Sequence, residues 1–277
     1  MALVTLKEVL KDAQQKQYAV GAFNVENMEM IQAVIHAAEK LGRAVILQTT
    51  PSTLKYAEPE LFFANVNVLA KKASVPVVMH LDHGNSYELA ERALKAGYSS
   101  IMIDGSKLPL EENILLTQKT RKLCEEYGAS IEAELGSIGG KEDELTAENA
   151  YTNVEDAKRF VAETGIDALA VAIGTAHGIY KSKPNIDLKR LEEIRSCVDV
   201  PLVLHGTSGV ADETVKACIQ RGICKVNYAT DLRIAFTKGV KKVLLTDEDV
   251  YDPKKYLTSA REEVKNKVIE RIQVCLG

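Results

Sequence analysis

The sequence predicts an α/β fold, a (β/α)8 TIM barrel that forms a single domain. Short apolar segments occur eight times along the 277 residues, and segments with helical periodicity separate them. Neither a linker nor a low-complexity stretch interrupts this alternation. Strict strand–helix alternation predicts a parallel sheet, and eight units in a chain of this length favour a closed barrel. An open, doubly wound sheet is the alternative.

The eight expected strands are short and rich in β-branched residues, a composition that suits strands buried on both faces. Each ends in polar or glycine-containing residues, where a loop begins. The segments cover residues 18–24, 44–50, 75–84, 99–106, 130–136, 168–178, 201–209 and 224–231.

Helical periodicity marks the intervening segments, several of which end in glycine, a common helix stop. They cover residues 28–42, 86–97, 111–128, 154–165, 188–198 and 211–222. Residues 137–153 form a long polar loop after the fifth strand, and the C-terminal part is expected to be a helix, a proline-containing loop and a final helix. The predicted domain is therefore residues 1–277, a barrel with a helical C-terminal extension.

Composition sets limits on the partners. A net charge of −4 gives no reason to expect nucleic acid or an anionic membrane surface as a partner. The N-terminus lacks a basic stretch followed by an apolar run, and no segment approaches the roughly 20 apolar residues that span a bilayer. The five cysteines include no CxxC pair and are interpreted as reduced, structural thiols. We expect a soluble, cytoplasmic protein.

Three of the five histidines end different predicted strands, and the C-terminal ends of barrel strands are where chemistry gathers. These are His83, His177 and His205, whereas His36 lies in a helix and His80 is interpreted as a satisfied core residue. Three neutral imidazoles with an open fourth position describe a catalytic zinc site, although other divalent metals also accept histidine. The pattern predicts a metal centre on one rim of the barrel.

Glycines follow two of these histidines, in His177-Gly178 and in the segment 205–209, and let backbone N–H groups approach a ligand. Asn227 and Thr230 lie at the end of the eighth strand. Barrels often bind phosphate at the loops after strands seven and eight, so an anion site is expected here. Simple turn glycines are the alternative.

Two acidic residues are candidates for proton transfer. Asp82 precedes His83. It either faces the pocket as a proton donor or orients a metal-binding histidine through a hydrogen bond. Glu142 belongs to the polar loop after the fifth strand, which is either a segment that closes over a substrate or a solvated acidic loop.

At this point several motifs, in order along essentially the whole chain, resemble a known family. The chain is similar to the class II ketose-bisphosphate aldolases, the fructose-1,6- and tagatose-1,6-bisphosphate enzymes. The matching motifs are YAVGAFNVENME, HLDHG, SIMIDGS, EAELGSIGGKED, LAVAIGTAHGIY, PLVLHGTSG, KVNYATDLR and YDPKKYL.

The resemblance implies zinc on His83, His177 and His205, with Glu134 and Asp104 at an alternative or neighbouring zinc position. It implies that Asp82 is the acid/base at the C4 oxygen and that Glu142 exchanges the C3 proton of dihydroxyacetone phosphate. Further residues would contact the substrate: Asn227 at the enediolate, Gly178, Gly206, Ser208 and Thr230 at the phosphate, and Asn24 and Thr50 along the pocket. The Gly178 and Gly206 carbonyls would also lie near a monovalent cation, Na⁺ or K⁺.

The implied reaction is the reversible cleavage of a ketose 1,6-bisphosphate to dihydroxyacetone phosphate and glyceraldehyde 3-phosphate. Zinc then acts as the Lewis acid, and no Schiff-base lysine is needed. Arg261 resembles the arginine with which fructose-type members bind the distal phosphate across a subunit boundary, so a homodimer or homotetramer is expected. Ala229 instead resembles the tagatose-type branch, and Thr207 adds bulk to the phosphate loop. The preferred sugar is therefore left open.

Two alternatives remain. One is a related aldolase that acts on another phosphorylated ketose, a deoxy-keto-gluconate phosphate or a sulfo-sugar. The other is a non-catalytic accessory subunit of an aldolase, which would be expected to lack metal ligands or the acid, whereas this chain keeps all of them.

Overall fold

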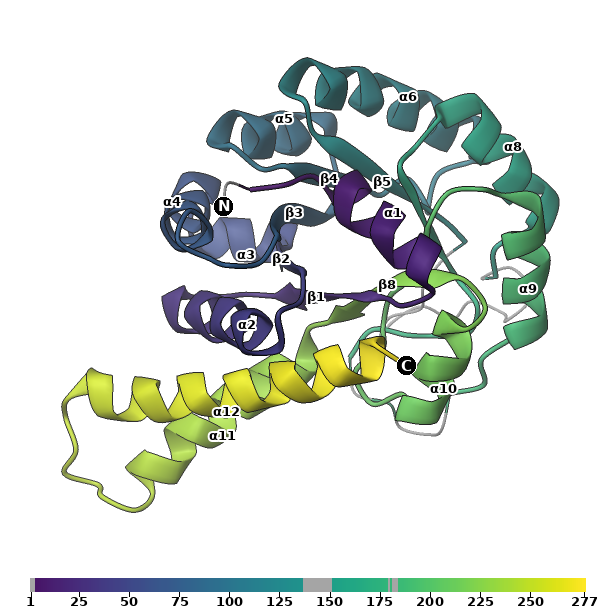
Figure 1. Cartoon of the computed structure of the whole chain (residues 1–277). Coiled ribbons are helices and arrows are strands. Elements are labelled where there is room, and N and C mark those ends of the chain that lie inside the picture. Colours follow the sequence, from purple (N-terminus) through teal and green to yellow (C-terminus); the bar gives the residue numbers. More distant parts are fainter. Residues whose placement is uncertain (1–2, 137–150, 179, 181–183) are drawn as a thin grey trace.

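Eight parallel strands close into a barrel in the order β1 to β8, with β8 pairing back onto β1 (Figure 1). The computed structural model describes residues 3–136, 151–178, 180 and 184–277. The closed barrel confirms the predicted fold class and excludes the open sheet.

All eight predicted strands are present, and each is shorter than the apolar segment that predicted it. Their bounds are β1 Val20–Asn24, β2 Val45–Thr49, β3 Val77–Gly84, β4 Ser100–Ile103, β5 Ser130–Leu135, β6 Ala168–Val171, β7 Leu202–Leu204 and β8 Ile223–Tyr228. The polar ends of several predicted segments therefore lie in loops beyond the strands.

Helices surround the strands, and the predicted ones are found close to their expected bounds. They are α2 Met28–Leu41, α5 Tyr87–Ala96, α6 Leu110–Tyr127, α8 Val154–Thr164, α9 Leu188–Cys197 and α10 Asp212–Ile219. Two further helices, α3 Pro51–Tyr56 and α4 Pro59–Ala70, connect β2 to β3 and were not predicted. Within the described part of the chain, none of the helices combines the length and apolarity needed to cross a bilayer.

The N-terminal helix α1, Leu6–Lys16, closes the N-terminal end of the barrel (Figure 1). Thr5 and Glu8 form a capping box at its start, which satisfies otherwise unpaired backbone donors. Its apolar stripe packs against inward-facing strand residues such as Ile46 and Met102. The capping box and the stripe are both readable in the sequence, but this helix was not predicted. With this end closed, the opposite end is left for a site.

The C-terminal helices α11, Thr230–Leu244, and α12, Pro253–Cys275, pack together and extend beyond the barrel (Figure 1). They match the predicted helix and final helix, but Pro253 is the first residue of α12 and not part of the connecting loop. Helix α12 also packs along α2, so it covers the outside of the barrel beside β1. The extension begins at Thr230, and only Ala229 separates it from the last strand.

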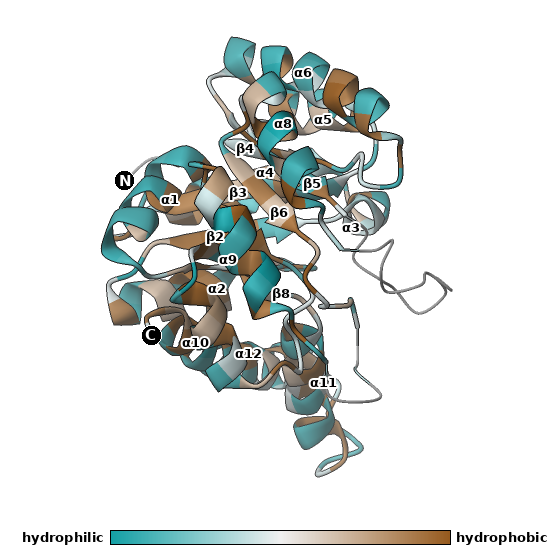
Figure 2. Ribbon diagram, turned by 90° about the vertical axis from the view of Figure 1, so that its right-hand side faces the viewer, coloured by the Kyte–Doolittle hydropathy of each residue, from teal (hydrophilic) through white to brown (hydrophobic). Residues whose placement is uncertain are grey.

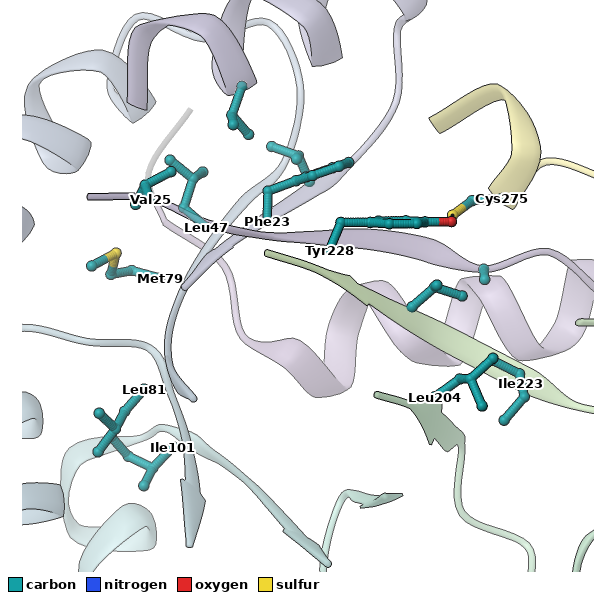
Figure 3. Packing of buried hydrophobic residues seen from close by; sticks show 14 of the residues in the cluster. Phe23, Val25, Leu47, Met79, Leu81, Ile101, Leu204, Ile223, Tyr228 and Cys275 are labelled. Carbon is teal, nitrogen blue, oxygen red and sulfur yellow. The ribbon is translucent and has the colours of Figure 1, made fainter. Parts of the chain in front are cut away.

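The core has two layers, one inside the barrel and one between the strands and the helices. In Figure 2 the strands are largely hydrophobic, while the outer turns of α8 and α9 carry hydrophilic residues. Figure 3 shows Phe23 of β1 stacked on Tyr228 of β8 in the outer layer, with ring centroids 5.6 Å apart. Because strand residues alternate in direction, this packing turns their neighbours Asn24 and Asn227 toward the barrel axis.

Candidate metal centre

Three histidines from three different strands or the loops that follow them converge at the C-terminal end of the barrel. His83, His177 and His205 each offer one nitrogen, and these nitrogens lie within 4.8 Å of one another. The ring centroids are 4.9 Å apart for His83 and His177, and 4.7 Å apart for His83 and His205. The structure thus places the predicted triad in the geometry of a single metal site.

The backbone at His83 lets two successive residues face the same pocket. In a regular strand Asp82 and His83 would point to opposite faces. The pairing of β3 with β4 shifts register between Leu81 and Gly84, and His83 has a φ of 50°, in the left-handed region that is uncommon outside glycine. This turn allows both side chains to line the site.

His177 does not end a strand, contrary to the prediction that the sixth strand continues to residue 178. Strand β6 stops at Val171, and Gly174 turns the chain with a φ of 107°. His177 is an exposed residue of the following loop. The hydroxyl of Tyr180 accepts a hydrogen bond from the Ala176 N–H at 2.7 Å and donates one to the Gly206 carbonyl at 2.7 Å, which ties this loop to the segment after β7.

Hydrogen bonds to carboxylates orient two of the three imidazoles. His83 Nδ1 lies 2.8 Å from Asp104 Oδ2, and His205 Nε2 lies 3.0 Å from Glu132 Oε1. A carboxylate accepts, so these nitrogens carry the protons and leave His83 Nε2 and His205 Nδ1 as the free ligand atoms. Those two atoms face each other at 2.9 Å. Two lone pairs in this arrangement repel unless a cation, either a proton or a metal ion, lies with them.

The charges around the triad also favour a cation. Burial lowers the pKa of His83, but the nearby carboxylates of Asp82, Asp104 and Glu134 outweigh it and raise that pKa to about 10. Burial, together with the Asp104 charge, raises the pKa of Glu134 to about 8. Both shifts favour a proton on these groups, and a divalent metal ion would compete with protons for the same positions.

A second group of possible ligands adjoins the first. His83, Asp104 and Glu134 also lie close enough to share an ion, since one ligand atom from each falls within 4.8 Å of the others. Glu134 Oε2 is buried, lacks a hydrogen-bond partner among the described residues, and lies 3.8 Å from both His83 Nδ1 and His205 Nδ1. These two groups are consistent with a zinc site that offers alternative ion positions.

Asp82 is held beside the triad by two amides. Its carboxylate accepts hydrogen bonds from Asn24 Nδ2 at 2.9 Å and from Asn227 Nδ2 at 3.2 Å. Burial raises the pKa of Asp82, but the charges of His83 and His205, with the Asn24 hydrogen bond, leave it below its usual value. Asp82 is thus a buried, ionised carboxylate that can accept a proton from a ligand.

The predicted phosphate residues lie on the loops after β6, β7 and β8. Gly178 and Gly206 have φ values of 98° and 65°, and a Cβ at Gly206 would lie 2.6 Å from the Ala176 carbonyl oxygen. The Ser208 hydroxyl accepts a hydrogen bond from the Asp231 N–H at 3.3 Å. Thr230 is the first residue of α11, so the partial positive charge of a helix N-terminus adjoins the two glycine loops. This arrangement suits an anion.

Two other predicted residues, Thr50 and Arg261, make their side-chain hydrogen bonds to residues outside this cluster. Thr50 caps α3, and its hydroxyl bonds to Ser52 and Thr53. Arg261 lies on α12 and donates to Gln32 Oε1 on α2 at 2.5 Å. Glu142 lies outside the described residues.

Sequence reasoning missed a charged layer beneath the metal centre. Lys225 and Glu132 are both fully buried, with Lys225 Nζ 2.9 Å from Glu132 Oε2. His80, interpreted as a satisfied core residue, is only half satisfied, because its Nδ1 bonds to Ser100 while Nε2 stays 3.7 Å from Glu132. The sequence did carry a signal, because Glu132 and Lys225 are charged residues within predicted buried strands. Each lies two positions before a site residue, Glu134 or Asn227, and therefore faces the same inner side of the barrel.

Comparison with known proteins adds the family. The family model described as fructose-bisphosphate aldolase class-II matches residues 4–276. The YdjI aldolase from Escherichia coli K12 is 36% identical, with a TM-score of 0.89 and coverage of 99% of this chain and 97% of that chain. A protein provisionally assigned as a fructose-1,6-bisphosphate aldolase from Coccidioides immitis is 31% identical, with a TM-score of 0.89 and coverage of 98% and 95%. The fructose-bisphosphate aldolase of Campylobacter jejuni, at 24% identity and a TM-score of 0.87 over 99% and 96% of the chains, shares the fold.

Proposed function

This chain belongs to the class II fructose-bisphosphate aldolase family, and we propose that it reversibly cleaves a ketose 1,6-bisphosphate, fructose or tagatose, to dihydroxyacetone phosphate and glyceraldehyde 3-phosphate. One observation carries the proposal: three histidine nitrogens and the ionised Asp82 converge at one end of the barrel. That combination supplies a metal site and a proton acceptor side by side, which is what aldol cleavage without a Schiff base requires.

His83, His177 and His205 would hold the metal, which we infer to be zinc, and Asp104 and Glu134 would hold it in a neighbouring position. When bound, zinc would supply Lewis acidity toward the oxygens of the substrate. Asp82 would take the proton of the C4 hydroxyl during cleavage and return it during condensation. Its two amide donors keep the carboxylate ionised and fixed in direction.

The phosphate of dihydroxyacetone phosphate would bind at the loops that carry Gly178, Gly206 and Ser208, and at Thr230 on the first turn of α11. Backbone N–H groups and a helix N-terminus favour an anion there, and Na⁺ or K⁺ near the Gly178 and Gly206 carbonyls is part of the proposal. Asn24 and Asn227 would line the pocket, and Glu142 would exchange the C3 proton. Thr50, which also caps α3, would line the pocket as well.

The position of Arg261 bears on the oligomeric state. Its guanidinium contacts Gln32 on the outside of the barrel rather than the site of its own chain. If Arg261 binds the distal phosphate, it does so for a second subunit, so we propose a homodimer or homotetramer. A cytoplasmic location also belongs to the proposal.

The choice of sugar is tested with a panel of substrates at matched enzyme concentration. We expect cleavage of at least one of fructose and tagatose 1,6-bisphosphate, because both carry the phosphate that the glycine loops would bind. The same sugar without its C1 phosphate should lose roughly 10²-fold or more in kcat/KM, since buried polar groups are then left unpaired. Product release would be followed with a dehydrogenase that consumes glyceraldehyde 3-phosphate or dihydroxyacetone phosphate.

Other results would select the alternatives. Cleavage of a deoxy-keto-gluconate phosphate or a sulfo-sugar, with neither bisphosphate cleaved, would assign the chain to a related aldolase. If no member of the panel is cleaved by the zinc-loaded chain, a non-catalytic accessory subunit is favoured.

A further inference from the structure

A buried ion pair lies directly beneath the metal centre, in a position where barrels are usually apolar. Glu132 on β5 and Lys225 on β8 are both 0% exposed. They stand two residues before Glu134 and Asn227 on their strands, and therefore face the barrel axis one layer below the site. A buried pair of this kind is weak evidence for stability, because removing two charges from water offsets much of their attraction. Its presence calls for another explanation.

The contacts of Glu132 suggest why the buried ion pair is present. Oε1 accepts from Lys225 Nζ at 3.2 Å and from His205 Nε2 at 3.0 Å, while Oε2 lies 2.9 Å from the same Nζ. The Lys225 ammonium thus donates to one oxygen of the carboxylate and forms an ion pair with the other, and the carboxylate in turn holds the imidazole. His205 is itself 0% exposed, so bulk water does not compete for its Nε2 proton.

We propose that Lys225 and Glu132 are positioning residues that fix His205 with its proton on Nε2 and its lone pair on Nδ1, directed at the metal. The geometry supports this direction, because His205 Nδ1 is the atom that faces His83 Nε2 at 2.9 Å. Partners of this kind, behind a metal-binding histidine, typically contribute tenfold to hundredfold to metal affinity. The inference rests on the proposed metal site.

A purely space-filling role is the competing explanation, and two double variants separate it from positioning. In Glu132→Gln with Lys225→Met, the layer is neutral but the amide oxygen still accepts from His205 Nε2. In Glu132→Leu with Lys225→Met, the layer is equally neutral and similar in volume, but no acceptor remains. Both variants avoid an unpaired buried charge, so they differ mainly in the hydrogen bond to His205.

Zinc affinity would be measured by competition with a chromophoric chelator, and the melting temperature of each metal-free variant would be recorded. We expect zinc to bind the leucine double variant about 10- to 100-fold more weakly than the glutamine double variant. Equal zinc affinities in the two folded variants would overturn the positioning role and leave the pair as packing.

A measurement on the unaltered chain covers the case in which the leucine variant does not fold. Long-range ¹H–¹⁵N correlation spectra of histidine-labelled, zinc-loaded protein report which nitrogen of each imidazole carries the proton. We expect His205 to be protonated on Nε2, and a proton on Nδ1 would overturn the inference. Failure of the unaltered chain to bind zinc at all would instead count against the proposed function.

Discussion

Replacing His177 with alanine is expected to remove most of the zinc affinity and to lower kcat/KM by about 10³-fold or more, equivalent to about 4 kcal/mol of transition-state stabilisation. The physical reason is that two histidines cannot hold a catalytic ion as three do. His177 is the informative ligand to remove, because its side chain is exposed on a loop. The fold should therefore survive, and zinc content and cleavage rate can be measured on a native barrel.

His36→Ala is the matched control, since His36 is also exposed but lies on α2, outside the triad. It should keep wild-type zinc content and turnover. If His177→Ala behaves as this control does, His177 is not a ligand and the triad is wrong.

Replacing Asp82 with asparagine is expected to lower kcat by roughly 10²- to 10⁴-fold, the usual contribution of a positioned acid or base. Asparagine keeps the size of the side chain but carries no transferable proton at neutral pH. It also cannot accept from both Asn24 and Asn227 as the carboxylate does. Because Asp82 is not among the grouped metal ligands, zinc content should stay close to one ion per chain.

Asp167→Asn makes the same chemical change away from the site, where Asp167 pairs with Lys7 at 3.0 Å. Its turnover should match that of the unaltered chain. Unchanged turnover in Asp82→Asn, measured with saturating zinc, would reduce Asp82 to a structural support of His83.

The barrel could be predicted because its signals are local. Each strand is an apolar run and each helix a periodic segment, so their alternation is visible without knowing which residues meet. The point at which a strand ends and its loop begins is harder to predict from the sequence. The length of the sixth strand was overestimated because the apolar run continues through Ile173. Gly174, with its positive φ, then turns the chain away from the strand.

The site could be predicted as a set of residue types but not as a set of contacts. The sequence shows that three histidines follow or end three predicted strands. It does not show the 2.9 Å approach of His83 to His205, which depends on the left-handed turn at residue 83. The Glu132–Lys225 pair was missed for the same reason, since 93 positions separate its members in the sequence. The role of Glu142 stays a prediction.

Metal dependence of carbon–carbon bond cleavage is the central claim, and titration of zinc into metal-free protein tests it most directly. The chain would be stripped with a chelator, and glyceraldehyde 3-phosphate release from the preferred ketose bisphosphate would be followed as zinc is returned. We expect the stripped protein to be inactive and its turnover to rise linearly to a plateau at about one zinc ion per chain, as one open-coordination site requires. Full turnover by protein shown to contain no bound metal would contradict the account.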